Sequence, residues 1–168
     1  MATQWNSGLT ERSDGFGVGS GEWNKLVQNM NFLAEVGQTS RSTDVSITAT
    51  AVGSANQILT LGAITYLNVP HVIEFYCPAY NGPAQETRFI LLDGTTVIGT
   101  IGRVGASAIT APLFLPYRFT PSAASHTYNI AAWLGGAGTG TVNSGSGGTA
   151  GDATTDLNTW MRIYRVPT

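Results

Sequence analysis

Two histidines, His71 and His126, are the side chains in this sequence best suited to bind a metal or to act as a general base. Each lies in a stretch with strand-like alternation, and they are far apart in the chain. A metal site would need several ligands that converge from separate strands. The sequence therefore predicts two hydrogen-bonded structural histidines and no metal ion.

Two carboxylates, Glu74 and Glu86, could form the acid pair of a glycoside hydrolase. The simpler interpretation places Glu74 on the outward side of a strand and Glu86 as a cap in a loop. Cys77 is the only cysteine, and its apolar surroundings are typical of a buried, inert thiol. The G-x-S-x-G and H-E-x-x-H motifs of hydrolases are missing from the sequence. We therefore expect no catalytic residues, no enzymatic activity and no cofactor.

A glycine-rich tract, residues 135–151, could cradle a phosphate, act as a linker or close a loop between strands. It falls between two strand-like stretches, 125–134 and 159–166, and no helical pattern follows it, so the context of a phosphate loop is missing. GTGTV, at its start, could itself form a strand. We expect a surface loop in which shortening over 144–151 is nearly neutral, because closure entropy changes slowly with loop length. Whether the loop has a recognition role is open.

Charged residues make up only 11% of the 168 residues, against about a quarter in a typical protein, and the net charge is −2. No basic stripe exists, so nucleic acid is not an expected partner. No apolar run is long enough to span a membrane, and no signal-peptide pattern is visible at the start. With 42% hydrophobic residues, the composition indicates a surface that other subunits cover; a neutral surface rich in small polar residues is the alternative.

The first 43 residues differ from the rest of the chain. Residues 1–21 are polar and glycine-rich without a lasting period, which predicts an extended arm. Residues 22–36 show the apolar spacing of one helix face, with Ser20 placed to cap the start and Gly37 to stop the helix. We expect this segment to pack on a partner or on the body of this domain through Trp5, Leu9, Phe16, Trp23, Leu26, Met30 and Leu33.

From residue 44 onward the hydrophobic period is two, as in strands. A hairpin is expected over 87–102, because Asp93-Gly94 suits a tight turn with positive φ. The stretch 111–121 contains prolines, which favours an edge or a bend. Together with strands expected over 44–52, 56–61, 63–69, 71–80 (ended by Pro78), 125–134 and 159–167, this predicts an all-β sandwich or barrel of about eight strands.

Several phrases of the sequence resemble the small jelly-roll structural proteins of tailed bacteriophages, which include head decoration proteins and the head or tip domains of tail fibres and minor tail proteins. FGVGSGEWNKLVQNMNFLAEV is similar to their N-terminal segment. TRFILLDGTTVIGT, TPSAASHTYNIAAWLGGAGTGTV and NTWMRIYRV resemble their hairpin, penultimate strand and closing strand. The layout is also similar to the C1q and tumour-necrosis-factor jelly roll.

The resemblance implies an attachment segment over 1–43 and a jelly-roll β-sandwich over 44–168. It also implies a homotrimer located in the virion, made in the host cytoplasm, that binds the major capsid protein or tail proteins and has no catalytic chemistry. Head decoration is the leading interpretation. The alternative is a tail-fibre or minor tail domain that binds a host receptor or glycan, through scattered aromatic residues or the loops over 79–86 and 143–158. A hydrolase or a cupin-like enzyme is the least favoured, since the acidic residues are few and a histidine cluster is missing.

Overall fold

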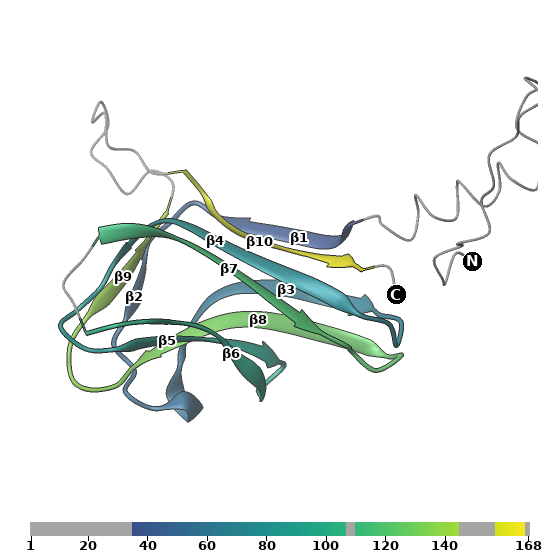
Figure 1. Ribbon diagram of the computed structural model, residues 1–168, viewed down its shortest axis with the longest axis horizontal. Coiled ribbons are helices and arrows are strands. Elements are labelled where there is room, and N and C mark those ends of the chain that lie inside the picture. The colour runs from purple at the N-terminus through teal and green to yellow at the C-terminus, as the bar shows by residue number, and fades with distance from the viewer. Residues whose placement is uncertain (1–34, 107–109, 145–156, 167–168) are drawn as a thin grey trace, which may run out of the picture.

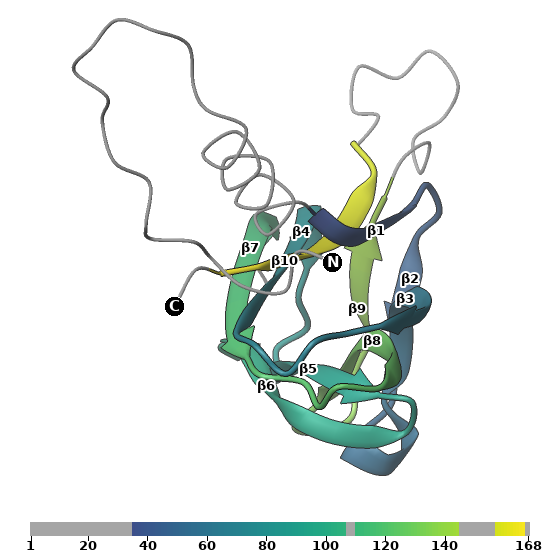
Figure 2. The same cartoon turned by 90° about the vertical axis from the view of Figure 1, so that its right-hand side faces the viewer.

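The computed structural model describes residues 35–106, 110–144 and 157–166, which form a sandwich of two antiparallel sheets (Figure 1, Figure 2). Sheet A contains β1, β2, β4, β7, β9 and β10, and sheet B has the order β3-β8-β5-β6. The strands in chain order are β1 (Glu35–Arg41), β2 (Val45–Ile47), β3 (Asn56–Thr65), β4 (His71–Asn81), β5 (Thr87–Asp93), β6 (Thr96–Val104), β7 (Thr110–Phe119), β8 (Ser125–Leu134), β9 (Gly140–Asn143) and β10 (Thr159–Arg165). A single 3-10 turn, η1 (Val52–Ser54), is the one helical element among the described residues.

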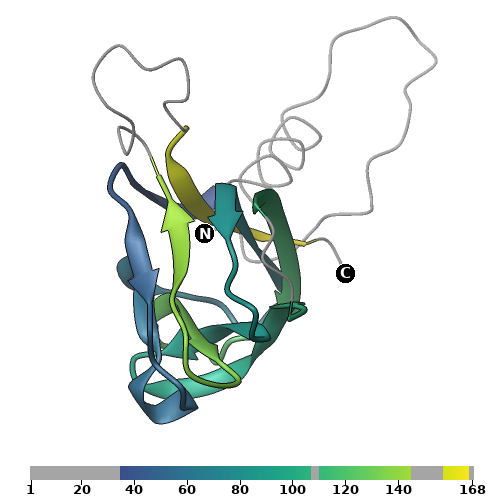
Figure 3. The ribbon, with the colours of Figure 1, turned by 90° about the vertical axis from the view of Figure 1, so that its left-hand side faces the viewer.

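Strand β4 is the centre of sheet A. It pairs with β7 along one side, and on its other side its first half pairs with β10 and its last residues pair with β9 (Figure 3). Beyond these, β1 pairs with β10 and β2 pairs with β9. Sheet A is therefore four strands wide, so the ten segments occupy eight strand positions. The chain crosses between the sheets in the manner of a jelly roll, which confirms the predicted all-β sandwich.

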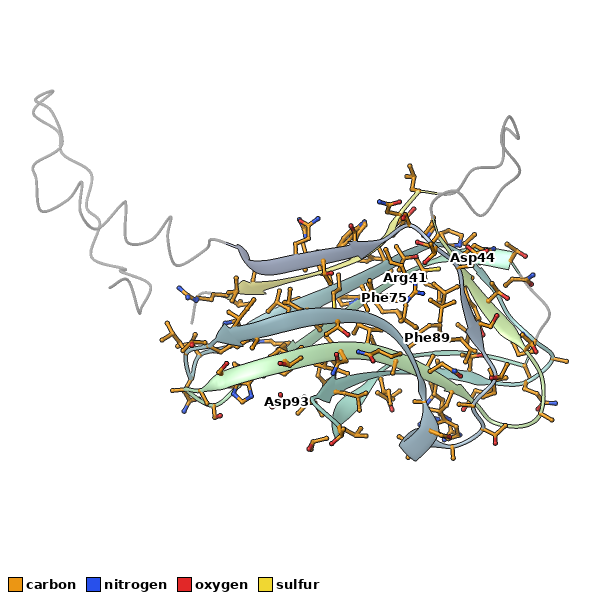
Figure 4. All side chains as sticks on the ribbon, turned by 180° about the vertical axis from the view of Figure 1, so that it is seen from behind. Arg41, Asp44, Phe75, Phe89 and Asp93 are labelled. Carbon is orange, nitrogen blue, oxygen red and sulfur yellow. The ribbon has the colours of Figure 1, made fainter. Side chains whose placement is uncertain are left out.

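Ser144 directly follows β9 and connects the ends of four strands of sheet A: β1, β2, β9 and β10. Its backbone N–H donates to Asp44 Oδ1 at 2.8 Å, and its hydroxyl oxygen accepts a hydrogen bond from the N–H of Thr159 at 2.8 Å. The same hydroxyl donates to the carbonyl oxygen of Arg41. Ser144 and Thr159 are fully buried, and the hydrogen bond between them holds the end of β9 next to the start of β10. Figure 4 shows Arg41 and Asp44 together at this end of the sandwich.

The core lies between the two sheets. Phe75 of β4 and Phe89 of β5 point toward one another there, with ring centroids 5.8 Å apart (Figure 4). Tyr80 packs edge-on to Phe89 at 5.3 Å, and its hydroxyl is hydrogen-bonded to Thr87. Each such side chain stabilises the fold by roughly 1.5–3 kcal/mol, because its apolar surface is removed from water. The inward residues alternate along each strand, as the period of two predicts.

Two glycines in β6 allow β6 and β7 to approach each other. A Cβ on Gly99 would lie 2.5 Å from the hydroxyl of Tyr117, and a Cβ on Gly102 would lie 2.6 Å from a methyl carbon of Leu115. Tyr117 and Leu115 belong to β7, which pairs with β4 alone among the described strands and so forms an edge of sheet A. The expectation that 111–121 lies at an edge is confirmed.

The N-terminal segment is described only from residue 35, so the predicted arm and most of the predicted helix lie outside the described residues. Glu35 and Val36, expected at the end of that helix, instead begin β1, and residues 35–41 pair with β10 in sheet A. Gly37, expected as a helix stop, is a close-approach glycine: a Cβ there would lie 2.6 Å from Ile64 Cδ1. Pairing with β10 overrides the local helical pattern.

Three strand boundaries also differ from the sequence prediction. Strand β2 ends at Ile47, because the next two backbone N–H groups donate to the side-chain oxygen of Asn56 rather than to a strand. Strand β3 runs through Gly62 without interruption, although its register shifts there. Pro78 does not end β4, which continues to Asn81 with a register irregularity between Cys77 and Tyr80. A bulge at this point accommodates the missing N–H of proline.

Replacing Ser144 should destabilise the whole sandwich. In Ser144→Ala, the buried Thr159 N–H and Arg41 carbonyl lose their partner, which should lower the free energy of unfolding by about 1–3 kcal/mol. Urea unfolding would measure this loss, with the exposed Ser46→Ala in β2 as the matched control. The neutral shortening expected over 144–151 must therefore exclude Ser144. Equal midpoints for the two variants would show that the hydrogen bonds of the Ser144 hydroxyl contribute nothing to stability.

Candidate functional site

The seven residues predicted to contact partners (Trp5, Leu9, Phe16, Trp23, Leu26, Met30 and Leu33) all lie outside the described residues. Within the described ranges, no group of three or more His, Cys, Asp or Glu side chains is placed to hold a metal ion. No helix in this part of the chain is long and apolar enough to cross a membrane. Cys77 is buried in β4, as its apolar surroundings predict, with its Sγ 4.0 Å from the carbonyl oxygen of Asn143.

The two glutamates considered as an acid pair have separate arginine partners. Glu74 accepts hydrogen bonds from Arg162 Nε at 2.6 Å and from the Tyr164 hydroxyl at 2.9 Å, on the outer face of sheet A. Glu86 lies directly before β5 of sheet B and pairs with Arg88. The arginine lowers the pKa of the Glu86 carboxyl, although burial opposes this. Each carboxylate is thus paired with its own arginine, and the two lie on different sheets, which is the wrong arrangement for an acid–base pair.

A serine, a histidine and an aspartate meet at one end of sheet B, which sequence reasoning missed. His126 Nδ1 lies 2.6 Å from Asp93 Oδ2, and His126 Nε2 lies 3.0 Å from the hydroxyl of Ser122. Asp93 comes from the β5–β6 turn and Ser122 from the loop before β8. The Ser-x-x-x-His spacing is local, but nothing in the sequence links it to Asp93, so only the pairing of β5 with β8 reveals the arrangement.

The contacts of the two ring nitrogens of His126 bear on whether this trio could perform nucleophilic catalysis. A serine nucleophile needs an unprotonated Nε2 to take its proton. Here Nε2 also lies 3.2 Å from the carbonyl oxygen of Ser122, and Nδ1 faces the Asp93 carboxylate, both of which can only accept. Nε2 therefore faces two oxygens of the same residue, the hydroxyl and the carbonyl of Ser122, while Nδ1 faces the carboxylate. The geometry suits a clamp that ties the 120–124 loop to the β5–β6 turn.

His71 lies in a buried aromatic cluster at the same end of the sandwich. Its Nδ1 donates to the carbonyl oxygen of Val69 at 2.7 Å, while its Nε2 is buried without a partner. The Tyr66 ring packs edge-on against it at 5.4 Å, and its strand-pair neighbour is Arg165. Burial lowers the pKa of His71; the hydrogen bond to Val69 opposes this shift and the positive charge of Arg165 adds to it. His71 is therefore a neutral structural histidine.

Burial also keeps the neighbouring phenols protonated. It raises the pKa of Tyr128 to about 12, with a smaller contribution from the Asp93 carboxylate, and it raises the pKa of Tyr66 further. The two rings lie 5.0 Å apart in an edge-to-face arrangement. At neutral pH both phenols retain their protons, so the cluster packs the end of the sandwich and offers neither a ready acid nor a base.

The strongest surface feature is an aromatic patch on the outer face of sheet A. It consists of Tyr76 from β4, Phe114 from β7 and Trp160 from β10, and we call it the aromatic face. Tyr76 and Trp160 stack with centroids 5.6 Å apart, and Phe114 approaches Trp160 edge-on at 6.5 Å. Their chain neighbours point into the core, so these three point away from it. Phe114 is 53% exposed.

An ion pair between Arg162 and Glu74 borders the aromatic face. Arg162, which donates to Glu74, also lies over the Trp160 ring at 5.5 Å and over the Tyr164 ring at 5.7 Å. Glu74 is buried beneath these groups. Since the charges neutralise one another within the chain, this part of sheet A presents a nearly neutral, aromatic surface. Surfaces of this kind are typical of the interfaces between macromolecules.

Comparison with known proteins gives little guidance. No family model and no curated protein matches the chain. Among solved structures, the EclA C-terminal domain, described as a sugar-binding protein, aligns with 76% of this chain and 77% of its own length, at 11% sequence identity and a TM-score of 0.37. A likeness this low carries no argument about function.

The stability of the protein should fall as pH drops below about 6.5, the ordinary pKa of histidine. His71 has a lowered pKa in the folded state, so its contribution is complete above that pH and is lost as pH falls toward the folded-state pKa. The measurement is the free energy of unfolding between about pH 7.5 and pH 5 for wild type and His71→Phe. Subtracting the two curves isolates the contribution of His71, because the other titratable groups are common to both proteins. A difference that does not change with pH would refute the assignment.

Proposed function

We propose that this chain is a non-enzymatic structural protein of a tailed-phage virion that assembles as a homotrimer, with head decoration as its role. The observation that carries the proposal is the aromatic face of sheet A. Three aromatic side chains from three strands form a contiguous apolar surface on a protein with few charges. Large exposed apolar patches are rare on monomeric proteins and mark interfaces.

The charge pair beside the aromatic face supports burial in an interface. Removing an isolated charge from water costs several kcal/mol, whereas Arg162 and Glu74 are already paired and Glu74 already lies below the surface. The Tyr164 hydroxyl fills a further acceptor site on Glu74. A partner surface can therefore cover this region without leaving an unpaired ion.

The edge strand β7 is poorly suited to pair with a strand of another subunit, which favours contact between subunits through the outer face of sheet A. Pro112 and Pro116 lie on its exposed side and lack the N–H group that an added strand would need. Phe114, between them, is left as the projecting apolar group. Three copies packed about a threefold axis would bury the aromatic face of each copy, and the threefold number follows from the resemblance to phage and C1q-like jelly rolls.

Attachment to the particle is assigned to the N-terminal segment, residues 1–43. A protein that binds only the assembled lattice stabilises it by mass action. Three segments on one trimer raise avidity without any single strong contact. A tail-fibre or minor tail protein that binds a host receptor or a glycan is the second candidate function, and the pocket described below favours it.

Placing a positive charge in the aromatic face should break the oligomer. Because Phe114 is exposed, Phe114→Lys should leave the monomer folded, yet it would bury an unpaired ammonium group in the interface. Light scattering should give a trimer mass for wild type and a monomer mass for the variant. The control is Ile98→Lys on β6, a similarly exposed apolar residue of sheet B. A wild-type monomer, or a trimer unaffected by Phe114→Lys, contradicts the proposed interface.

Removing residues 1–18 should abolish docking while the oligomer keeps its mass. Co-sedimentation with DNA-filled phage heads that lack this protein measures the docking, and wild type should saturate the heads at a fixed ratio to the major capsid protein. Loss of folding in the truncated chain would mean that the arm belongs to the core. Binding of wild type to tails or host cells instead of heads would favour the second candidate.

A further inference from the structure

A pocket of about 240 Å³ lies at the outer face of sheet B. It is formed by η1, the start of β3, the turn between β5 and β6, and the middle of β8. None of the residues that line it carries a charge. Pockets for drug-sized ligands are about 300–1,000 Å³, so this one suits a single sugar ring or a single substituent of a larger ligand.

The polar side of the pocket is a chain of amides whose orientation is fixed. The carbonyl oxygen of Gly94 can only accept, so the amide NH₂ of Asn129, 2.9 Å away, must face it. Asn129 Oδ1 then faces Gln57, whose Nε2 donates to it at 2.9 Å. Gln57 Oε1 is left as an acceptor, and Asn129, itself buried, retains a second N–H hydrogen. The pocket therefore offers one fixed acceptor and one fixed donor.

The apolar side of the pocket consists of aliphatic side chains. Val52 and Val97 are 44% and 46% exposed, and Leu92 lies beside them in the lining. Covering the two exposed valines is favourable because apolar surface is removed from water. A ligand that covers them must also supply hydrogen-bonding partners to the two amides, which otherwise bind water. A ligand that combines a methyl group with a neutral donor and acceptor satisfies both sides.

We propose that this pocket binds the acetamido group of an N-acetylated hexosamine. The ligand N–H donates to Gln57 Oε1, the ligand carbonyl accepts from Asn129, and the methyl group lies against Val52 and Val97. The sugar ring projects past the turn at Thr95. A charged ligand is disfavoured because no lining residue could neutralise it.

The site does not depend on the assembly proposed above. The aromatic face lies on the outer side of sheet A, whereas the pocket lies on the outer side of sheet B, so association through sheet A leaves the pocket exposed. Glycan binding at this position would suit recognition of a host surface. The Phe114→Lys variant tests sugar binding separately from trimer formation, because it should bind the sugar as wild type does whether or not a trimer forms.

The experiment is a titration with N-acetylglucosamine, glucose and N-methylacetamide, followed by the side-chain amide NMR signals of Gln57 and Asn129. N-acetylglucosamine should bind with a millimolar dissociation constant, glucose should not shift these signals, and N-methylacetamide should bind about tenfold more weakly than the sugar. Gln57→Leu removes the acceptor and Val97→Thr makes the apolar contact polar. Each should weaken sugar binding about five- to tenfold.

The matched control is Gln85→Leu, which changes a glutamine in the loop before β5, outside the pocket lining. Val97→Thr changes an exposed residue and Gln85→Leu a half-buried one, and both should have the unfolding midpoint of wild type. Gln57→Leu also removes the donor to the buried Oδ1 of Asn129, so it should stay folded but unfold at a somewhat lower urea concentration. Three results would overturn the proposal: no binding of N-acetylglucosamine, equal binding of N-methylacetamide and the sugar, or undiminished sugar binding in both pocket variants.

Discussion

The hydroxyl group of Ser144 holds together the sheet on which the rest of the structure depends. The hydroxyl connects the end of β9 to the start of β10 and to the carbonyl oxygen of Arg41 at the end of β1. The backbone N–H of Ser144 donates to the side chain of Asp44, directly before β2. Without these bonds, two strand positions of sheet A would each be broken in the middle. With them, β9 and β10 line up along one side of β4 as a single strand, which keeps sheet A four strands wide.

Local sequence signals were sufficient where a single side chain or a short spacing determines the structure. Asp93-Gly94 predicted the β5–β6 turn, and Gly94 has a φ of +57°, which glycine adopts without strain. Alternation predicted most strands because one face of each is buried. The prolines of 111–121 predicted an edge, and two of them, Pro112 and Pro116, lie at exposed positions of β7, where a free edge needs no N–H donor.

Prediction failed where tertiary pairing outweighs local preference. The helical pattern was predicted to run to residue 36, yet residues 35–41 pair with β10 in sheet A, and a Cβ on Gly37 would lie 2.6 Å from Ile64 Cδ1. Pro78 ends a strand in isolation, but in β4 a bulge absorbs it. Neither the Ser122–His126–Asp93 clamp nor the aromatic face has a motif, because each assembles residues from strands that are distant in the chain.

The two outer faces of the sandwich differ in chemistry: one suits contact with another protein subunit, and the other suits a small ligand. On sheet A the aromatic rings are large and flat, and the neighbouring ions are paired within the chain, so a broad protein surface can cover them at little electrostatic cost. On sheet B the apolar groups are small and are interrupted by ordered amides, which suits a small polar ligand better than a second sheet. Burying those amides against an apolar partner would leave Gln57 Oε1 without a hydrogen bond, at a cost of about 1–3 kcal/mol. The outer face of sheet A is thus the one that a partner subunit can cover, and sheet B is the one that can remain in contact with solvent and small ligands.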